Sequence, residues 1–190
     1  MKKYMIFMLI SIVAITSATD MVVNYTDGSM ISIPIEQVDQ ITFEQYEMVT
    51  VEGIELQWRT DDEYLYVNVS APTTGWVAVG FDPTNQMADA NIIIGYVDDG
   101  GDLFIRDDFG TSPTSHASDE SLGGVNNITQ EYGMEENDMT KLHFRIPLNS
   151  GDMYDKVLVP GNSYNIILAY GSADNFTGFH TLATGTNIEL

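Results

Sequence analysis

The chain has 190 residues, of which 7 are Lys or Arg and 28 are Asp or Glu, so its formal net charge at pH 7 is −21. Such an acidic surface disfavours binding to nucleic acid and to anionic membranes, since both are bound through Lys and Arg side chains. The chain contains no cysteine, which excludes disulfides, cysteine-ligated metal centres and the covalent attachment of c-type haem.

The first residues of the chain have the pattern of an export signal. Lys2 and Lys3 precede an apolar run over 5–15, and small residues follow at 16–18. This order predicts a secretory signal peptide over 1–18. No other run approaches the roughly 18 apolar residues of a membrane span. We therefore expect a mature protein that is secreted or periplasmic.

The segment after this signal alternates apolar and polar residues on both sides of an Asp-Gly pair. Residues 21–25 read MVVNY and residues 30–35 read MISIPI, with Asp27 and Gly28 between them. Asp-Gly between two alternating runs is a strong signal for a hairpin turn. The sequence predicts a small N-terminal β-hairpin segment over 19–47, followed by a main domain over 48–190.

The main domain is predicted to be all-β. Its apolar residues alternate with period two. Strands are expected near 49–58, 63–70, 75–82, 91–98, 102–107, 124–133, 139–147 and 163–171. Turns rich in Gly, Asn, Asp and Pro separate the strands, and no stretch has a convincing helical period. Many short strands in this arrangement are typical of an antiparallel sandwich.

Acidic residues are plentiful, but none forms a recognisable site by spacing. Residues 98–102 read DDGGD and resemble a calcium loop only superficially, because the alternating Asp pattern and the later Glu of an EF-hand loop are missing. A hairpin turn with solvated carboxylates is the simpler interpretation.

One methionine and one histidine lie in unusual surroundings. Met87 is in the middle of the polar loop DPTNQMADA, and His180 follows Phe176 and Phe179 in a terminal segment that contains several glycines. A thioether and an imidazole are together a known pair of axial haem ligands, and without cysteine such a haem would be non-covalent. Met87 could equally fill a gap in the core, and His180 could be structural. Spacing alone leaves these alternatives open.

Two long stretches resemble the DOMON family. Residues 75–109 read GWVAVGFDPTNQMADANIIIGYVDDGGDLFIRDDF, which is similar to the family's Gly-Trp strand, methionine loop and acidic turn. Residues 142–172 read LHFRIPLNSGDMYDKVLVPGNSYNIILAYGS, which is similar to its later strands, and the family's terminal histidine matches His180. The resemblance covers about residue 49 to the C-terminus. It implies an immunoglobulin-like antiparallel β-sandwich of about ten strands.

The resemblance also implies a function. Haem-binding members, of the type of the cytochrome domain of cellobiose dehydrogenase, use a methionine in this loop and a histidine near the end, and this sequence has both. The resemblance therefore implies haem b held by Met87 and His180, with single electrons passing to or from a redox partner that is basic at the contact. The aromatic candidates for the pocket wall, about half of which we expect to be ordinary core residues, are Trp76, Phe81, Tyr96, Tyr170, Phe176 and Phe179.

Members of the family without the ligand pair are thought to bind sugars or to act as interaction modules. A carbohydrate-binding module without haem is therefore the alternative for this chain. We do not expect an independent enzyme, because a haem iron with both axial positions filled has no open site for a substrate or oxygen.

Overall fold

The computed structural model describes residues 20–24, 30–38 and 45–190, and the chain divides into two units, 1–44 and 45–190. In the first unit, β1 (Asp20–Asn24) pairs antiparallel with β2 (Met30–Pro34), and the short 3-10 helix η1 (Ile35–Gln37) follows. The predicted signal peptide and the Asp-Gly turn lie outside the described residues. Within the part of the chain that the structure describes, no helix is long and apolar enough to span a membrane.

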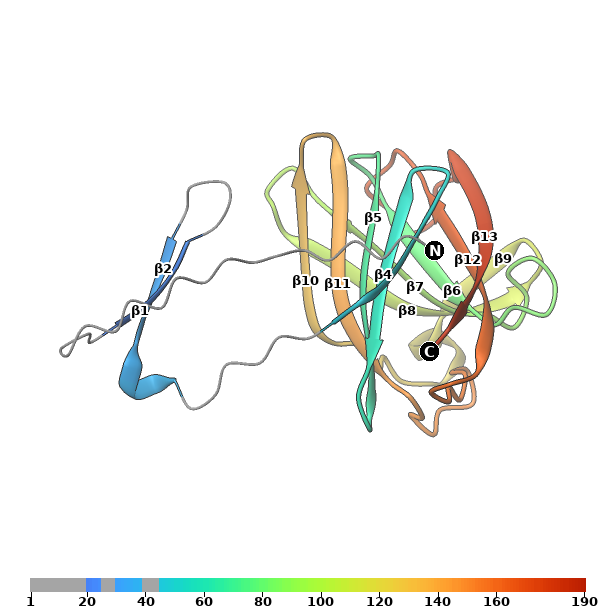
Figure 1. Ribbon diagram of the computed structural model, residues 1–190. Coiled ribbons are helices and arrows are strands. Elements are labelled where there is room, and N and C mark those ends of the chain that lie inside the picture. The colour runs from blue at the N-terminus through green and yellow to red at the C-terminus, as the bar shows by residue number, and fades with distance from the viewer. Residues whose placement is uncertain (1–19, 25–29, 39–44) are drawn as a thin grey trace. The chain divides into compact units, whose positions relative to one another are not determined.

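Residues 45–190 form two antiparallel sheets that lie face to face (Figure 1). The first has the strand order β10-β11-β5-β4-β3 and contains β3 (Glu47–Val51), β4 (Ile54–Thr60), β5 (Tyr64–Ala71), β10 (Thr129–Glu136) and β11 (Met139–Pro147). The second has the order β13-β12-β6-β7-β8-β9 and contains β6 (Val77–Phe81), β7 (Asn91–Val97), β8 (Leu103–Ser112), β9 (Ser115–Ser118), β12 (Ser163–Tyr170) and β13 (Leu182–Glu189). One short helix, α1 (Asp119–Leu122), follows β9. The predicted all-β sandwich is confirmed.

The hydrophobic core fills the space between the two sheets. Successive side chains of a strand point to opposite faces, so every second residue contributes to this core. The five-stranded sheet contributes Leu65, Val67 and Val69 from β5 and Leu142, Phe144 and Ile146 from β11. The six-stranded sheet contributes Val77, Val79 and Phe81 from β6 and Ile166 and Leu168 from β12. The alternate residues of the six-stranded sheet point outwards.

Several of the predicted elements differ from the structure: the strand expected over 124–133 is β10 at Thr129–Glu136, and β13 was not predicted. The single strand predicted over 49–58 is a hairpin, β3–β4, whose two turn residues, Glu52 and Gly53, have positive φ angles of 50° and 88°. Such a turn usually carries Asn-Gly or Asp-Gly. Because Glu52 takes the place of the Asn or Asp, the turn was not predicted from the sequence. The long loop predicted over 110–123 instead contains the end of β8, the edge strand β9 and α1.

Candidate functional site

The outer face of the six-stranded sheet carries an apolar patch. The strand register places Ala169, Ala78 and Ile94 in one outward row and Ile167, Gly80 and Ile92 in the next. We call outer patch the cluster of buried and half-buried residues on this face: Trp76, Ala78, Met87, Ala90, Ile92, Ile94, Tyr96, Ile167, Ala169 and Phe176. The outer patch is separate from the core between the sheets.

The connection between β6 and β7, residues 82–90, brings Met87 onto the outer patch. The backbone N–H of Asp89 donates to the carbonyl of Gly110 on β8 at 2.7 Å, and the N–H of Gly110 donates to the carbonyl of Ala90 at 2.9 Å. A Cβ atom at Gly110 would overlap the carbonyl oxygen of Met87. Glycine at this position therefore lets the loop lie directly on β8 and holds Met87 over the sheet.

The connection between β12 and β13, residues 171–181, lies at the other end of the sheet. Tyr170, the last residue of β12, pairs with Val77 at the start of β6, whereas the loop that carries Met87 follows the end of β6. Phe176 of this second loop packs on the outer patch, with its ring centroid 5.1 Å from that of Tyr96. His180 is in the same loop and is exposed. The two loops that carry the predicted ligands thus contact one face of one sheet from its opposite ends.

Trp76 lies where the second loop meets the outer patch. Its side chain is only 5% exposed, and its indole Nε1 has no hydrogen-bond partner in the described part of the chain. Glycines 171 and 178 both lie against this nitrogen. A buried donor without a partner costs free energy, and such atoms in native proteins usually serve a ligand or a water molecule. The outer patch therefore includes one unused polar group.

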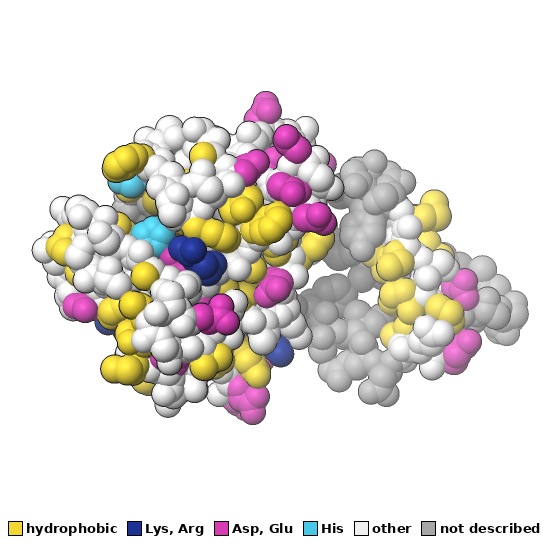
Figure 2. Space-filling view, turned by 180° about the vertical axis from the view of Figure 1, so that it is seen from behind, with side chains coloured by type: hydrophobic (Ala, Val, Ile, Leu, Met, Phe, Trp, Pro, Cys, Tyr) yellow, Lys and Arg dark blue, Asp and Glu magenta, His cyan; other side chains and the backbone are white. Residues whose placement is uncertain are grey.

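A charged cluster borders the outer patch on β8. Arg106 donates from Nε and Nη2 to the two carboxylate oxygens of Asp108, at 2.5 and 2.7 Å, and His116 Nδ1 lies 2.5 Å from Asp108 Oδ2. Burial opposes ionisation of Asp108, but the hydrogen bonds from His116 and Arg106 outweigh it and lower its pKa. The Arg106 guanidinium also lies 4.4 Å from the ring centroid of Phe176. Figure 2 views the molecule from the back of Figure 1 and shows hydrophobic side chains beside histidine and basic side chains.

This charged cluster was not predicted from the sequence. The alternation along β8 contained the signal, because Arg106, Asp108 and Gly110 are two residues apart and must share a face. Their outward direction follows from the register, in which Arg106 pairs with Ile94 and Asp108 pairs with Ile92. His116 joins them only because β9 folds back on β8, with His116 opposite Gly110.

The model of the DOMON domain family matches residues 51–171. The chain belongs to the DOMON domain family. Within that family it is similar to DBH-like monooxygenase protein 1 of Mus musculus, with 29% identity over 134 residues. The match covers 69% of this DOMON chain but only 21% of the mouse protein, so the chain spans about a fifth of that relative.

One of the solved structures similar to this DOMON domain shares its fold, and a second is similar at a lower score. The cytochrome domain of Myriococcum thermophilum cellobiose dehydrogenase superimposes with a TM-score of 0.54 at 11% identity, covering 90% of this chain and 88% of that domain. A family 9 carbohydrate-binding module from Caldicellulosiruptor kristjanssonii in complex with glucose gives a TM-score of 0.38 at 14% identity, covering 75% of this chain and 73% of the module.

The eight predicted site residues of this DOMON domain fall into three groups. Four of them meet on the outer patch: Trp76, Met87, Tyr96 and Phe176. Phe81 is 1% exposed in the core between the sheets, and Tyr170 packs against the same core. Phe179 is 97% exposed, and His180 beside it is also exposed. The sequence showed which residues are aromatic but not which face of β6 or β12 each one occupies.

A hollow lies on the outer face of the five-stranded sheet, and most of the residues that line it are polar, so we call it the polar hollow. It has a volume of about 340 Å³ and is lined mainly by residues of β4, β5, β10 and β11. Asn68 Oδ1 lies 2.7 Å from His143 Nδ1 in its floor, and Tyr132 on β10 is 61% exposed. Burial, together with the nearby positive charge of Arg59, lowers the pKa of His143.

Proposed function

We propose that this DOMON domain is an exported b-type cytochrome domain that binds haem b non-covalently between Met87 and His180 and carries single electrons. The observation that supports this best is the position of the two loops. Met87 packs on the outer patch from the connection that follows β6, and the loop of His180 packs on the same patch, through Phe176, from the opposite end of the sheet. Haem bound over this face would therefore be held by Met87 from one loop and by His180 from the other.

The residues around the outer patch suit this cofactor chemically. A thioether and an imidazole add no charge to the apolar surface formed by Ala78, Ile92 and Ile94. The indole N–H of Trp76 is a buried donor without a partner in the described part of the chain, and Arg106, which is paired with Asp108, would be the basic residue beside the anionic edge of a haem. The haem itself would supply a reversible one-electron iron couple, whose potential Met/His ligation raises. Phe81 and Tyr170 belong to the core between the sheets and are left out of the proposed pocket.

The surface charge supports a redox partner that is basic where it docks. The net charge of −21 gives the full chain a negative field that attracts basic proteins at low ionic strength. We expect no independent enzyme activity, because both axial positions of the iron would be filled by side chains of the protein.

Ligand substitutions test the proposal. Met87→Ala and His180→Ala should each abolish the low-spin haem spectrum of the reconstituted protein, since each removes one axial ligand. Met153→Ala, at a methionine that is 82% exposed, and His143→Gln, on the other sheet, are the matched controls and should keep the spectrum. If both ligand variants keep the wild-type spectrum, the ligand assignment is wrong.

Carbohydrate binding is the second candidate, and the polar hollow of the five-stranded sheet favours it. Exposed Tyr132 offers an aromatic ring for stacking on a sugar, beside the polar groups of Asn68 and His143. Titration of the colourless protein with soluble oligosaccharides tests this function. Binding that Tyr132→Ala removes would support it, and the absence of heat and of chemical-shift changes across the titration series would contradict it.

A further inference from the structure

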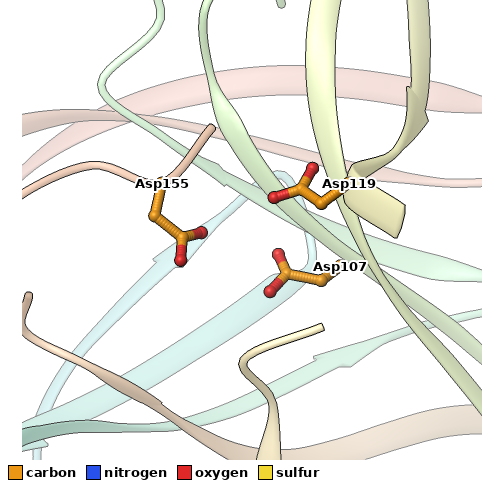
Figure 3. Close-up of side chains that lie close together, drawn as sticks. All are labelled: Asp107, Asp119 and Asp155. Carbon is orange, nitrogen blue, oxygen red and sulfur yellow. The ribbon is translucent and has the colours of Figure 1, made fainter. Parts of the chain in front are cut away.

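Three aspartates from three distant segments meet at one place inside the second unit. Asp107 is on the inner face of β8, Asp119 is the first residue of α1, and Asp155 is in the connection between β11 and β12. One carboxylate oxygen from each lies within 4.8 Å of the others. Figure 3 shows the three carboxylates turned towards a common centre.

Two of these carboxylates are buried, and Asp155 is half-buried and accepts a hydrogen bond from Asn91. Asp107 is 1% exposed and Asp119 is 0% exposed. Oδ1 of Asp107 and both oxygens of Asp119 have no hydrogen-bond partner in the described part of the chain. The N–H of Asn127 donates to Asp107 Oδ2 at 3.0 Å, so the unsatisfied oxygens belong to Asp107 and Asp119. A native protein rarely leaves several buried carboxylate oxygens unsatisfied.

Asn91 adds a fourth oxygen next to the cluster. Its side-chain Nδ2 donates to Asp155 Oδ1 at 2.7 Å, and its buried Oδ1 has no partner among the described residues. Asn91 is the first residue of β7 and is 2% exposed, so its amide is held in place by the sheet. The amide contacts the group of three carboxylates through its Nδ2, and its unsatisfied oxygen is a neutral hard donor beside them.

The negative charges of the cluster are not offset by basic side chains beside it among the described residues. Burial, followed by the charges of neighbouring aspartates, raises the pKa of Asp107 to about 8 and that of Asp119 to about 7. Asp155 is shifted upwards for the same reasons, and Asp152 adds another negative charge nearby. None of these three pKa values is lowered by a Lys, Arg or His side chain. Both the arrangement of the carboxylates and their uncompensated charge therefore favour a bound cation at this position.

We propose that Asp107, Asp119 and Asp155, with the amide oxygen of Asn91, form a structural calcium site. All four donors are hard oxygens, which suit Ca²⁺ or Mg²⁺ and disfavour copper and zinc, since those metals prefer imidazole or thiolate ligands. Calcium fits better than magnesium because the ligands come from separate segments and include several carboxylates, whereas magnesium usually keeps most of its water and binds one or two carboxylates.

The proposed ion would reinforce a place where hydrogen bonds already connect distant segments, such as Asn91 to Asp155 and Tyr154 to Leu122. It would link β7 and β8 of the six-stranded sheet to α1 and to the connection between β11 and β12. This site does not depend on the proposed haem. Asp107 points to the inner face of β8, whereas its neighbour Asp108 points outwards to Arg106 and His116.

Calcium titration of the chelator-treated full chain, without haem, tests the inference. Isothermal titration with calcium chloride should give saturable binding below about 1 mM, the range of extracellular calcium modules, and calcium should raise the melting temperature. Asp119→Asn should weaken calcium binding at least ~10-fold, because it removes one of three charged ligands. In a chelator, the same variant should melt no lower than wild type, since it removes a buried negative charge, and this distinguishes ligand loss from misfolding.

Asp62→Asn is the matched control, because Asp62 is an exposed acidic residue between β4 and β5. It should bind calcium as wild type does. Asp155→Asn, at a second ligand, should repeat the result of Asp119→Asn. The inference is overturned if calcium gives neither heat nor a thermal shift, if magnesium binds as tightly as calcium, or if both ligand variants bind like wild type.

Discussion

Gly110 determines how closely the loop of Met87 can approach the sheet. Its missing side chain lets the carbonyl of Met87 and the N–H of Ala90 lie directly on β8. We expect Gly110→Ala to push this loop away, to lower the free energy of unfolding by about 2 kcal/mol and to reduce haem uptake. Gly185→Ala on β13, where an added Cβ would lie 3.1 Å from the nearest atom, is the control for a glycine substitution in a strand. Chemical denaturation and haem titration of the two variants measure the difference. Equal behaviour would show that the loop does not need this close approach.

His143 makes stability depend on pH in a predictable direction. Burial lowers its pKa below the ordinary value of 6.5, so the folded protein binds this proton less readily than the unfolded chain does. Its contribution to stability is therefore present above about pH 6.5 and is lost as the pH falls towards its folded-state pKa. As the pH falls from about 7 to about 5, the unfolding free energy of wild type should decrease more than that of His143→Gln. Parallel curves for the two proteins would contradict this expectation.

At the level of single residues, the sequence indicates which side chains are unusual for their position but not which other side chains surround them in the fold. Met87 was recognised because a thioether is unusual in a polar turn, and the structure places it against the outer patch. Phe81 and Trp76 lie only five residues apart and both looked like pocket residues, yet Phe81 faces the core and Trp76 faces outwards. Because five is an odd number, simple alternation places these two side chains on opposite faces, and the structure follows that alternation from Trp76 to Phe81.

At the level of elements, one buried threonine joins the two sheets. Thr140 on β11 is 0% exposed, and its Oγ1 lies 2.9 Å from the carbonyl oxygens of both Thr73 and Gly75, in the connection before β6. Thr140→Val keeps the shape but leaves buried carbonyls without their donor, so we expect a loss of about 1–3 kcal/mol in unfolding free energy. Thr50→Val, on the exposed face of β3, should change stability by less than about 0.5 kcal/mol. Urea denaturation of both variants checks this, and a Thr140→Val protein as stable as wild type would refute the role of the hydroxyl.

Strands with clear alternation could be predicted, whereas elements that depend on distant partners could not. β11 was predicted at 139–147 because Leu142, Phe144 and Ile146 alternate with polar residues, and the structure has the strand at those residues. β13, with the sequence LATGTNIE, has little apolar alternation and is a strand because it pairs along its whole length with β12. The aspartate cluster was missed for the same reason, since Asp107, Asp119 and Asp155 are brought together only by the tertiary fold.

At the level of the whole molecule, the proposed electron transfer should depend strongly on salt. The chain has 28 acidic and 7 basic residues, so a basic redox protein would be steered towards it by long-range attraction. The second-order rate of electron transfer with a small basic redox protein should fall by about tenfold or more between about 20 mM and about 200 mM salt. An acidic redox protein of similar potential serves as the control and should show a rate that rises with salt. A rate that does not change with salt for either partner would rule out electrostatic steering.

The absorption spectrum of the protein supplied with haem, first oxidised and then reduced with dithionite, tests the central claim most directly. The proposed Met87/His180 coordination predicts a Soret band, sharp α and β bands after reduction and a pyridine haemochrome of the b type. A protein that stays colourless and does not take up added haemin would contradict the cytochrome assignment. Met87 and His180 would then be packing and surface residues, and the polar hollow of the five-stranded sheet would become the leading candidate for the binding site of this DOMON domain.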